Sequence, residues 1–242
     1  MRLTELERIE RPAQLLFMRD VVAPQRPVVI RGEMDDWEAL GRWSPANLQG
    51  RCADRLVRVR RGAGTGDDQL HGLLDRMDGV LSASLSETVP EVSHEVRVPQ
   101  FVPRSPLSTQ IDDPELWIGG ADTTPLAFTP GTESLVQVIH GQVEARLFPM
   151  SEGRGLYRRA PWQTQSTMSP VAAFEPDPVV HARALDVSGH AVTLEPGEML
   201  YIPPYWWRAL QTRGPAIRVH TTWTSLYRPA PWTRAGLSLL LR

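Results

Sequence analysis

From residue 116 onward, apolar residues occur in short runs separated by turn residues, which is the pattern of successive β-strands. Residues 152–178 interrupt this pattern with four prolines and predict a long excursion from the sheet. The runs that we expect to form strands are 116–120, 123–126, 134–141, 143–149, 192–194, 199–202, 206–210 and 217–222. Their succession predicts a mainly β fold, a double-stranded β-helix in which two sheets face one another as a jelly-roll barrel.

The N-terminal part of the chain carries patterns that would support such a barrel. The apolar spacing of residues 3–22 predicts two short helices separated by Pro12, and residues 26–32 predict a strand entered through proline and left through glycine. Ser44 predicts an N-cap for a short helix over residues 45–48, because proline is favoured at the first helical position.

Residues 56–114 combine one strand, one helix and irregular chain. Residues 56–60 alternate apolar and basic side chains as a half-exposed strand does, and residues 61–69, rich in Gly and Asp, predict a solvated connecting loop. Residues 70–85 have helical apolar spacing, and residues 90–114, with five prolines, predict irregular chain around the barrel. The leucine-rich tail, 229–242, predicts either a cover for a sheet edge or a contact in a homodimer.

Length and composition are those of one globular domain. A chain of 242 residues with 41% hydrophobic content buries one sizeable core. We expect a single domain in which residues 1–115 support the barrel with helices and strands, 116–226 form the barrel core and 227–242 form the tail.

Charge and the N-terminus restrict the partners and the compartment. The formal net charge of −2 provides no basic field, so we expect neither nucleic acid nor a membrane as partner. The charged N-terminus lacks a signal-peptide core and no run of about 18 apolar residues occurs, so we expect a cytoplasmic protein.

Cysteine and lysine usage excludes two kinds of chemistry. The single cysteine, Cys52, excludes an internal disulfide and a cysteine metal cluster within one chain, and it predicts a small buried hydrophobic residue. All 26 basic residues are Arg, which suggests a GC-rich bacterial genome and excludes a lysine Schiff base or a lysine general base.

The segment Pro-Gly-Glu-x-Leu-Tyr-Ile-Pro-x-x-Trp-Trp, residues 196–207, resembles the late strands of a known family. It is similar to the JmjC/cupin-like group of Fe(II)- and 2-oxoglutarate-dependent oxygenases, which hydroxylate or demethylate proteins and related substrates. In that family the residue after the second Trp is a His that binds iron. In this chain it is Arg208.

The resemblance also locates the other two iron ligands, which the family supplies from a Thr-Pro-x-His-x-Asp run. Counting forward from Thr124, the two positions hold Ala127 and Thr129; counting back from Gly141, they hold Phe128 and Pro130. These side chains do not form the two-histidine, one-carboxylate triad of such enzymes. We therefore expect no metal and no cofactor, that is, a degenerate pseudo-oxygenase.

Co-substrate binding is affected as well. The family lysine that holds 2-oxoglutarate corresponds here to Val143, whereas Thr124 matches a family residue that can hydrogen-bond the oxo-acid. If Arg208 keeps the inward direction of the lost His, its guanidinium requires a carboxylate neighbour or an anionic ligand. Arg is well suited to bidentate recognition of carboxylates and phosphates.

Further candidate site residues follow from the same resemblance. His220 lies on the last strand, where the family often has an Asn facing the co-substrate, and it is either a proton-transfer group or a hydrogen-bonded structural histidine. Glu133, or Ser134 in the other register, occupies the place of another family Asn, and Glu133 is a candidate ion-pair partner for Arg208.

Aromatic residues cluster at the rim of the expected pocket. Tyr205, Trp206 and Trp207 follow one another, and we expect one Trp ring to pack outside the barrel and the other to floor a ligand pocket. The ligand-binding candidates are thus Arg208, His220, Thr124, Glu133, Thr129, Trp207 and Tyr205.

Three functional hypotheses follow. The first is a metal-independent pseudo-oxygenase that binds an anionic small molecule, a peptide or a partner in the barrel groove. The second is a non-oxidative, metal-independent enzyme of bacterial secondary metabolism, with Arg208 and His220 as catalytic residues. The third is an Fe(II)- and 2-oxoglutarate-dependent hydroxylase with relocated ligands, for example His220 and Glu133.

Overall fold

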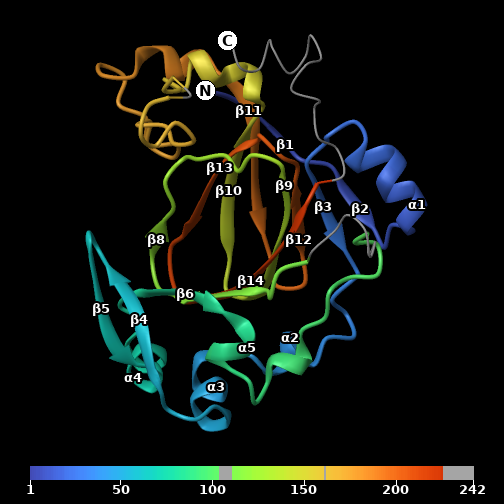
Figure 1. Cartoon of the computed structure of the whole chain (residues 1–242), viewed down its shortest axis with the longest axis vertical. Helices are drawn as coiled ribbons and strands as arrows, with labels where there is room; N and C mark the ends of the chain where they lie inside the picture. Colours follow the sequence, from blue (N-terminus) through green and yellow to red (C-terminus); the bar gives the residue numbers. More distant parts are fainter. Residues whose placement is uncertain (104–110, 161, 226–242) are drawn as a thin grey trace.

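A computed structural model describes residues 1–103, 111–160 and 162–225 of the chain. Within these ranges the strands form two sheets that face one another, as Figure 1 shows. The architecture is mainly β with few helices, and it confirms the predicted jelly-roll barrel.

The smaller sheet has five strands among the described residues, with strand order β1-β11-β10-β13-β8. Its strands pair antiparallel except at one edge, where β1 runs parallel to β11. The strand bounds are β1 Arg2–Glu5, β8 Asp122–Thr123, β10 Val143–Phe148, β11 Ser188–Leu194 and β13 Trp207–Thr212.

The larger sheet has nine strands in the same ranges, with strand order β2-β3-β12-β9-β14-β7-β6-β4-β5. At one end of this sheet β6 pairs with β7 and with β4, and the β4–β5 hairpin extends the sheet beyond the barrel. The strand bounds are β2 Arg8–Glu10, β3 Val28–Arg31, β4 Leu56–Arg61, β5 Gly64–Gln69, β6 Val80–Ser84, β7 Glu115–Gly119, β9 Thr132–His140, β12 Met199–Ile202 and β14 Ala216–Thr224.

The space between the two sheets is filled by branched apolar side chains. Alternate residues of β9 and β12 meet alternate residues of β10, β11 and β13 there, because successive side chains of a strand point to opposite faces. This inner cluster contains Val136, Val138, Leu200, Ile202, Val143, Ala145, Leu147, Val192, Leu194 and Leu210.

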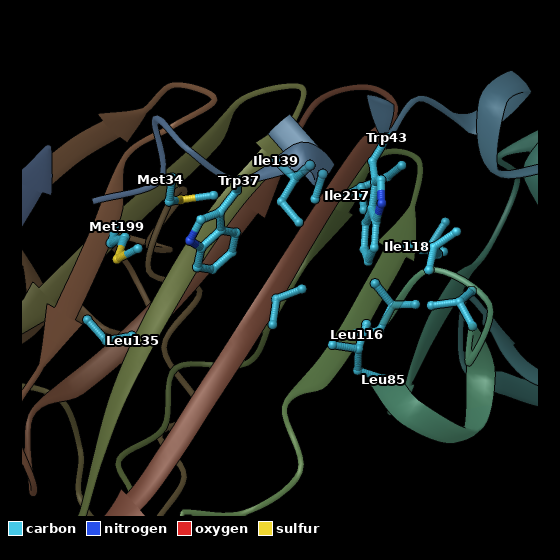
Figure 2. Packing of buried hydrophobic residues seen from close by; sticks show 14 of the residues in the cluster. Met34, Trp37, Trp43, Leu85, Leu116, Ile118, Leu135, Ile139, Met199 and Ile217 are labelled. Carbon is cyan, nitrogen blue, oxygen red and sulfur yellow. The ribbon is translucent and has the colours of Figure 1, made fainter. Parts of the chain in front are cut away.

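The outer face of the larger sheet is covered by short helices, which form the largest apolar cluster. Figure 2 shows Trp37 and Trp43 lying over strand residues that include Ile139 and Ile217. The helical bounds in this region are α1 Gln14–Phe17, η1 Met18–Val22, α2 Glu38–Arg42, α3 Pro45–Arg51, α4 Leu70–Arg76, α5 Leu85–Thr88 and η2 Ser93–Glu95. Ser44 caps α3 as predicted, since its hydroxyl accepts the Asn47 N–H at 3.2 Å.

The outer face of the smaller sheet is covered by the predicted excursion. Residues of this segment, among them Leu156 and Val171, pack against Phe148 and Trp207. The excursion is longer than the predicted 152–178, since it fills the whole connection between β10 and β11. Its described residues include two short helical turns, η3 Met150–Arg154 and η4 Ala182–Asp186.

The N-terminal segment differs from the prediction of two helices in residues 3–22. Its first part forms strands β1 and β2, and only the part after Pro12 is helical. The helical apolar spacing is overridden because β1 and β2 pair in parallel with β11 and β3 and thereby extend both sheets at their edges.

Two further predictions between residues 61 and 85 are wrong. The predicted loop 61–69 is largely strand β5, which pairs with β4 along its whole length and is held there by ion pairs such as Arg61 with Asp68. The predicted helix 70–85 ends at Arg76, where Met77 adopts a left-handed conformation, and β6 follows. The segment joins the sheet because β6 pairs with both β4 and β7.

In the part of the chain that the structure covers, no helix is long and apolar enough to cross a membrane. The predicted tail contact, 229–242, lies outside the described residues.

Candidate functional site

A cavity of ≈ 570 Å³ opens at the end of the barrel that is nearest to the β4–β5 hairpin. Its walls come from both sheets: residues of β6, β7 and β14 on one side, and of β13 and the segment 124–127 on the other. The hairpin contributes Arg58, Arg60 and Thr65 to the lining. The cavity therefore combines barrel positions with an element outside the barrel.

Arg208 projects into this cavity from β13. It alternates with Leu210, which belongs to the inner cluster, so both side chains point between the sheets. Its backbone forms an antiparallel bridge with Ala127, in which the Arg208 N–H donates to the Ala127 carbonyl at 2.8 Å. Burial lowers the pKa of the Arg208 guanidinium, and no carboxylate of the described chain forms an ion pair with it.

Arg218 and His220 enter the cavity from β14 on the opposite sheet. They pair with Val138 and Val136 of β9, whose side chains lie in the inner cluster, so they share the inner face. Arg218 Nε donates to His220 Nε2 at 3.0 Å, and Arg218 Cζ lies 3.8 Å from the centroid of the Trp117 ring. The larger sheet thus presents the Arg218 guanidinium to the cavity, stacked on the Trp117 ring.

The buried position of Arg218 makes its charge costly. The residue is 1% exposed, and burial lowers the pKa of its guanidinium to about 9. Its Nη1 atom has no hydrogen-bond partner among the residues described. A buried donor without a partner costs free energy, so this atom points to a missing acceptor.

His220 is neutral in this environment. Burial lowers the pKa of the imidazole well below its ordinary value, and the nearby charges of Arg218 and Arg208 lower it further. Because Nε2 accepts from Arg218, the hydrogen-bond pattern assigns the proton to Nδ1, which lies 4.0 Å from Glu115 Oε2.

The cavity carries an excess of positive charge. Of the described residues that line it, Arg58, Arg60, Arg208 and Arg218 are cationic and Glu115 is the one carboxylate. Arg60 is neutralised by Asp122, whose two carboxylate oxygens each accept from Arg60 Nη2 at 2.8 Å. The two deep guanidiniums have no such partner, so the electrostatics favour an anion.

The positions that the family uses for iron do not fit a metal ion here. The bridge between Ala127 and Arg208 supports the count forward from Thr124, because Phe128 points outward and packs on Trp207. The donor set is then a methyl group, the Thr129 hydroxyl and a guanidinium. Across the described ranges, no group of three or more His, Cys, Asp or Glu is arranged to hold a metal ion.

The proposed pairing of Glu133 with Arg208 is wrong. Glu133 lies opposite Trp223 on the outer face of the larger sheet, where its carboxylate accepts from the Tyr201 hydroxyl at 3.1 Å and from the Ser225 hydroxyl at 2.6 Å. Burial raises the pKa of this carboxyl. Ser134, the alternative residue, has the inward direction, since it pairs with Ile202 of the inner cluster.

The threonine candidates have different locations. Thr124 lines the cavity, but its hydroxyl accepts the Leu210 N–H at 2.8 Å and so supports the backbone. Thr129 is not among the lining residues, and its carbonyl accepts the Tyr205 N–H. Thr124 remains a wall residue of the site, whereas the wall does not include Thr129.

The aromatic candidates do not line the cavity. Trp207 is fully buried on the outer face of the smaller sheet, and Tyr205 packs beside Phe128 in the same outer cluster. Trp206 stacks on His190 and donates to the Gln25 carbonyl. The expectation that one Trp ring floors the pocket is wrong, because β13 begins at Trp207 and directs that ring away from Arg208.

Five of the described lining residues that the sequence did not indicate are charged or aromatic. Arg218 precedes His220 by two positions in a predicted strand, so the two-residue period could have identified it. Trp117, Glu115, Arg58 and Arg60 reach the cavity through the pairing of β7 with β14 and of β4 with β6, and no local signal indicates that pairing.

Comparisons with known proteins agree with the architecture. The family model of the Cupin-like domain matches residues 75–228. "Lysine-specific demethylase 8" of Xenopus tropicalis is 25% identical over 239 residues, which cover 91% of this chain and 53% of that protein. "Lysine-specific demethylase JMJ30" of Arabidopsis thaliana is 27% identical over 228 residues, 86% of this chain and 52% of that protein.

A third relative matches over a shorter stretch. "HSPB1-associated protein 1" of Homo sapiens is 30% identical over 113 residues, 46% of this chain and 23% of that protein. The chain spans about half the length of the two demethylase relatives. The family match confirms the resemblance seen in the sequence, and the chain belongs to the Cupin-like domain family.

Proposed function

We propose that this cupin-like protein binds an anionic small molecule in its barrel cavity and does so without Fe(II) or 2-oxoglutarate. The observation that carries the proposal is Arg208, whose guanidinium points between the sheets at the position of the family's last iron ligand and has no carboxylate partner in the described chain. A cation there repels a metal ion and attracts an anion.

The residues around Arg208 support this proposal. Ala127 provides no ligand atom beside it, and Val143, at the family's lysine position, belongs to the apolar inner cluster. The names of two relatives refer to lysine demethylation. In the resembled family, demethylation depends on Fe(II). The side chains at the family's iron positions in this chain, Ala127, Thr129 and Arg208, do not favour an iron ion.

A binding role is better supported than proton-transfer catalysis. His220 is the only candidate acid or base among the described lining residues besides Glu115, and its Nε2 lone pair is occupied by the Arg218 N–H. A depressed pKa keeps the imidazole neutral near pH 7 and unsuited to act as an acid. A relocated iron site of His220 with Glu133 is not supported, since the two side chains lie on opposite faces of the sheet.

The test is anion binding measured by calorimetry, with a panel of carboxylates and phosphates, on the wild-type protein and on Arg208→Met. Loss of the guanidinium should weaken the best-bound anion at least about tenfold. The control is Arg213→Met, which removes an exposed arginine that pairs with Glu144 and does not line the cavity. Unchanged affinity in Arg208→Met would overturn the proposal.

Metal reconstitution provides a second, independent test. Protein incubated anaerobically with Fe(II) and then desalted should retain far less than one equivalent of iron. Stoichiometric iron that is lost in His220→Ala would instead favour a relocated metal site. Glu133→Gln should leave anion affinity unchanged, because Glu133 faces away from the cavity.

A further inference from the structure

Arg218 is the strongest indication of what the cavity binds. Its side chain lines the cavity, is almost fully buried, and keeps Nη1 without an acceptor in the residues described. Its other contacts hold it in place: Nε donates to His220, and the guanidinium carbon lies 3.8 Å from the centroid of the Trp117 ring. A positioned, buried donor without an acceptor is the arrangement of a ligand-binding group.

Arg208 and Arg218 reach the same space from opposite walls. Arg208 comes from β13 of the smaller sheet and Arg218 from β14 of the larger one. Both charges act on the imidazole of His220, so the three groups form one cluster. Two guanidiniums on facing sheets define a point between them that is open to an anion.

We infer that the ligand is a phosphate monoester whose dianionic phosphoryl group lies between Arg208 and Arg218. The inference rests on the proposed function and specifies its ligand class. Two charges on one group match two guanidiniums, whereas a single carboxylate would leave one of them uncompensated. A tetrahedral phosphoryl group also presents oxygens in several directions, while a planar carboxylate is held best by one guanidinium fork.

The remainder of the cavity restricts the ester group. Glu115, whose Oε1 accepts from the Ser82 hydroxyl, lies 4.0 Å from His220 Nδ1 and acts on both deep guanidiniums. Its carboxylate therefore repels a second anionic group beside it. Arg58 is 77% exposed at the side chain and therefore stands at the mouth. The ester group that accompanies the phosphoryl head is accordingly neutral or cationic where it lies beside Glu115.

Three probes separate charge from shape in a calorimetric test at about pH 7.5, where a phosphate monoester is mostly dianionic. Methyl phosphate has the proposed charge and shape. Methyl sulfate has the same shape with one charge, and succinate has two charges on separate planar groups. Methyl phosphate should bind at least about tenfold more tightly than either of the others.

The variants assign this preference to Arg218. Arg218→Met should reduce the affinity for methyl phosphate at least about tenfold and bring it near that of methyl sulfate, whereas Arg213→Met should leave it unchanged. A phosphoserine pentapeptide tests whether the phosphoryl group comes from a peptide. Binding of the peptide as tightly as methyl phosphate would identify that source, and weaker binding would identify a small molecule.

The wild-type protein provides a test that does not depend on the folding of a variant. Below the second pKa of methyl phosphate, about 6, its affinity should fall roughly tenfold per pH unit, whereas methyl sulfate should show no such fall. Parallel profiles for the two probes would overturn the phosphoryl assignment. Tight, Arg208-dependent binding of succinate without methyl phosphate would refute this inference and leave the proposed function intact; binding of no anion at all would refute both.

Discussion

Ala127 and Arg208 occupy opposed positions of an antiparallel bridge, in which each backbone N–H donates to the carbonyl of the other residue, at 3.0 and 2.8 Å. The backbone at the family's metal positions is therefore paired by main-chain hydrogen bonds alone. Because this pairing does not depend on the side chains, the barrel can exchange a ligand set for a methyl group and a guanidinium without losing its strands.

This bridge predicts that a metal site can be restored. The triple variant Ala127→His, Thr129→Asp and Arg208→His should bind Co(II) or Fe(II), because it supplies two imidazoles and a carboxylate from neighbouring strands. Elemental analysis and the visible absorption of bound Co(II) measure the result. The single variant Ala127→His, which keeps the repelling guanidinium, should stay metal-free; a metal-free triple variant would show that these are not the ligand positions.

The neutral state of His220 predicts a loss of stability in acid. Its folded pKa lies below the unfolded value of about 6.5, so the unfolded chain binds more protons as the pH falls, at a cost of up to about 1.4 kcal/mol per pH unit. Above about pH 6.5 this contribution is absent. Urea unfolding between about pH 7.5 and pH 5 should show a smaller decline for His220→Gln than for the wild type.

The charged groups around His220 make this prediction specific. Arg218 and Arg208 oppose its protonation, and Glu115, at 4.0 Å, is the carboxylate that faces it. His94→Gln, at an exposed histidine, serves as the matched control and should reproduce the wild-type decline. Equal declines for wild type and His220→Gln would contradict a buried neutral imidazole.

Replacing Arg218 should stabilise the fold and weaken anion binding. Replacement of this buried, incompletely paired cation by methionine should raise the free energy of unfolding by about 1–3 kcal/mol, while anion affinity falls. Urea denaturation at neutral pH measures the change. A clear destabilisation would indicate that the contacts with Trp117 and His220 outweigh the cost of burial.

Arg58 at the mouth predicts a kinetic rather than an equilibrium effect. Because its side chain is 77% exposed and pairs only loosely with Asp67 at 3.7 Å, Arg58→Ala should slow anion association several-fold at about 20 mM salt and much less at about 200 mM. Stopped-flow measurements at both salt concentrations provide the comparison. A change confined to the dissociation rate would mean that Arg58 contacts the bound ligand directly.

The barrel strands were accessible from the sequence through the two-residue period of strands with one buried face. The inward direction of Arg208 was expected from the family resemblance, and it agrees with the alternation of Arg208 and Leu210 along β13. Glu133 shows the limit of this reasoning. An error of one residue in the register transfers a side chain to the opposite face, and here the inward position belongs to Ser134.

Elements formed by long-range pairing were not accessible. Residues 64–69 have the sequence Gly-Thr-Gly-Asp-Asp-Gln, which has low intrinsic strand propensity, and they form β5 because β4 pairs with them and arginines neutralise their carboxylates. The strands β1 and β2 likewise depend on partners more than 15 residues away. Consequently the hairpin residues at the rim of the cavity were not predicted, whereas Arg208 and His220 at its base were.

The β4–β5 hairpin supplies Arg58, Arg60 and Thr65 to a cavity whose deep groups all come from barrel strands. Figure 1 shows this hairpin at the end of the nine-stranded sheet, where β6 joins it to the barrel. Access of the ligand at the entrance and its binding at the base are thus encoded in separate stretches of the chain. Either stretch can change during evolution without the other, and grafting residues 56–69 would exchange the entrance alone.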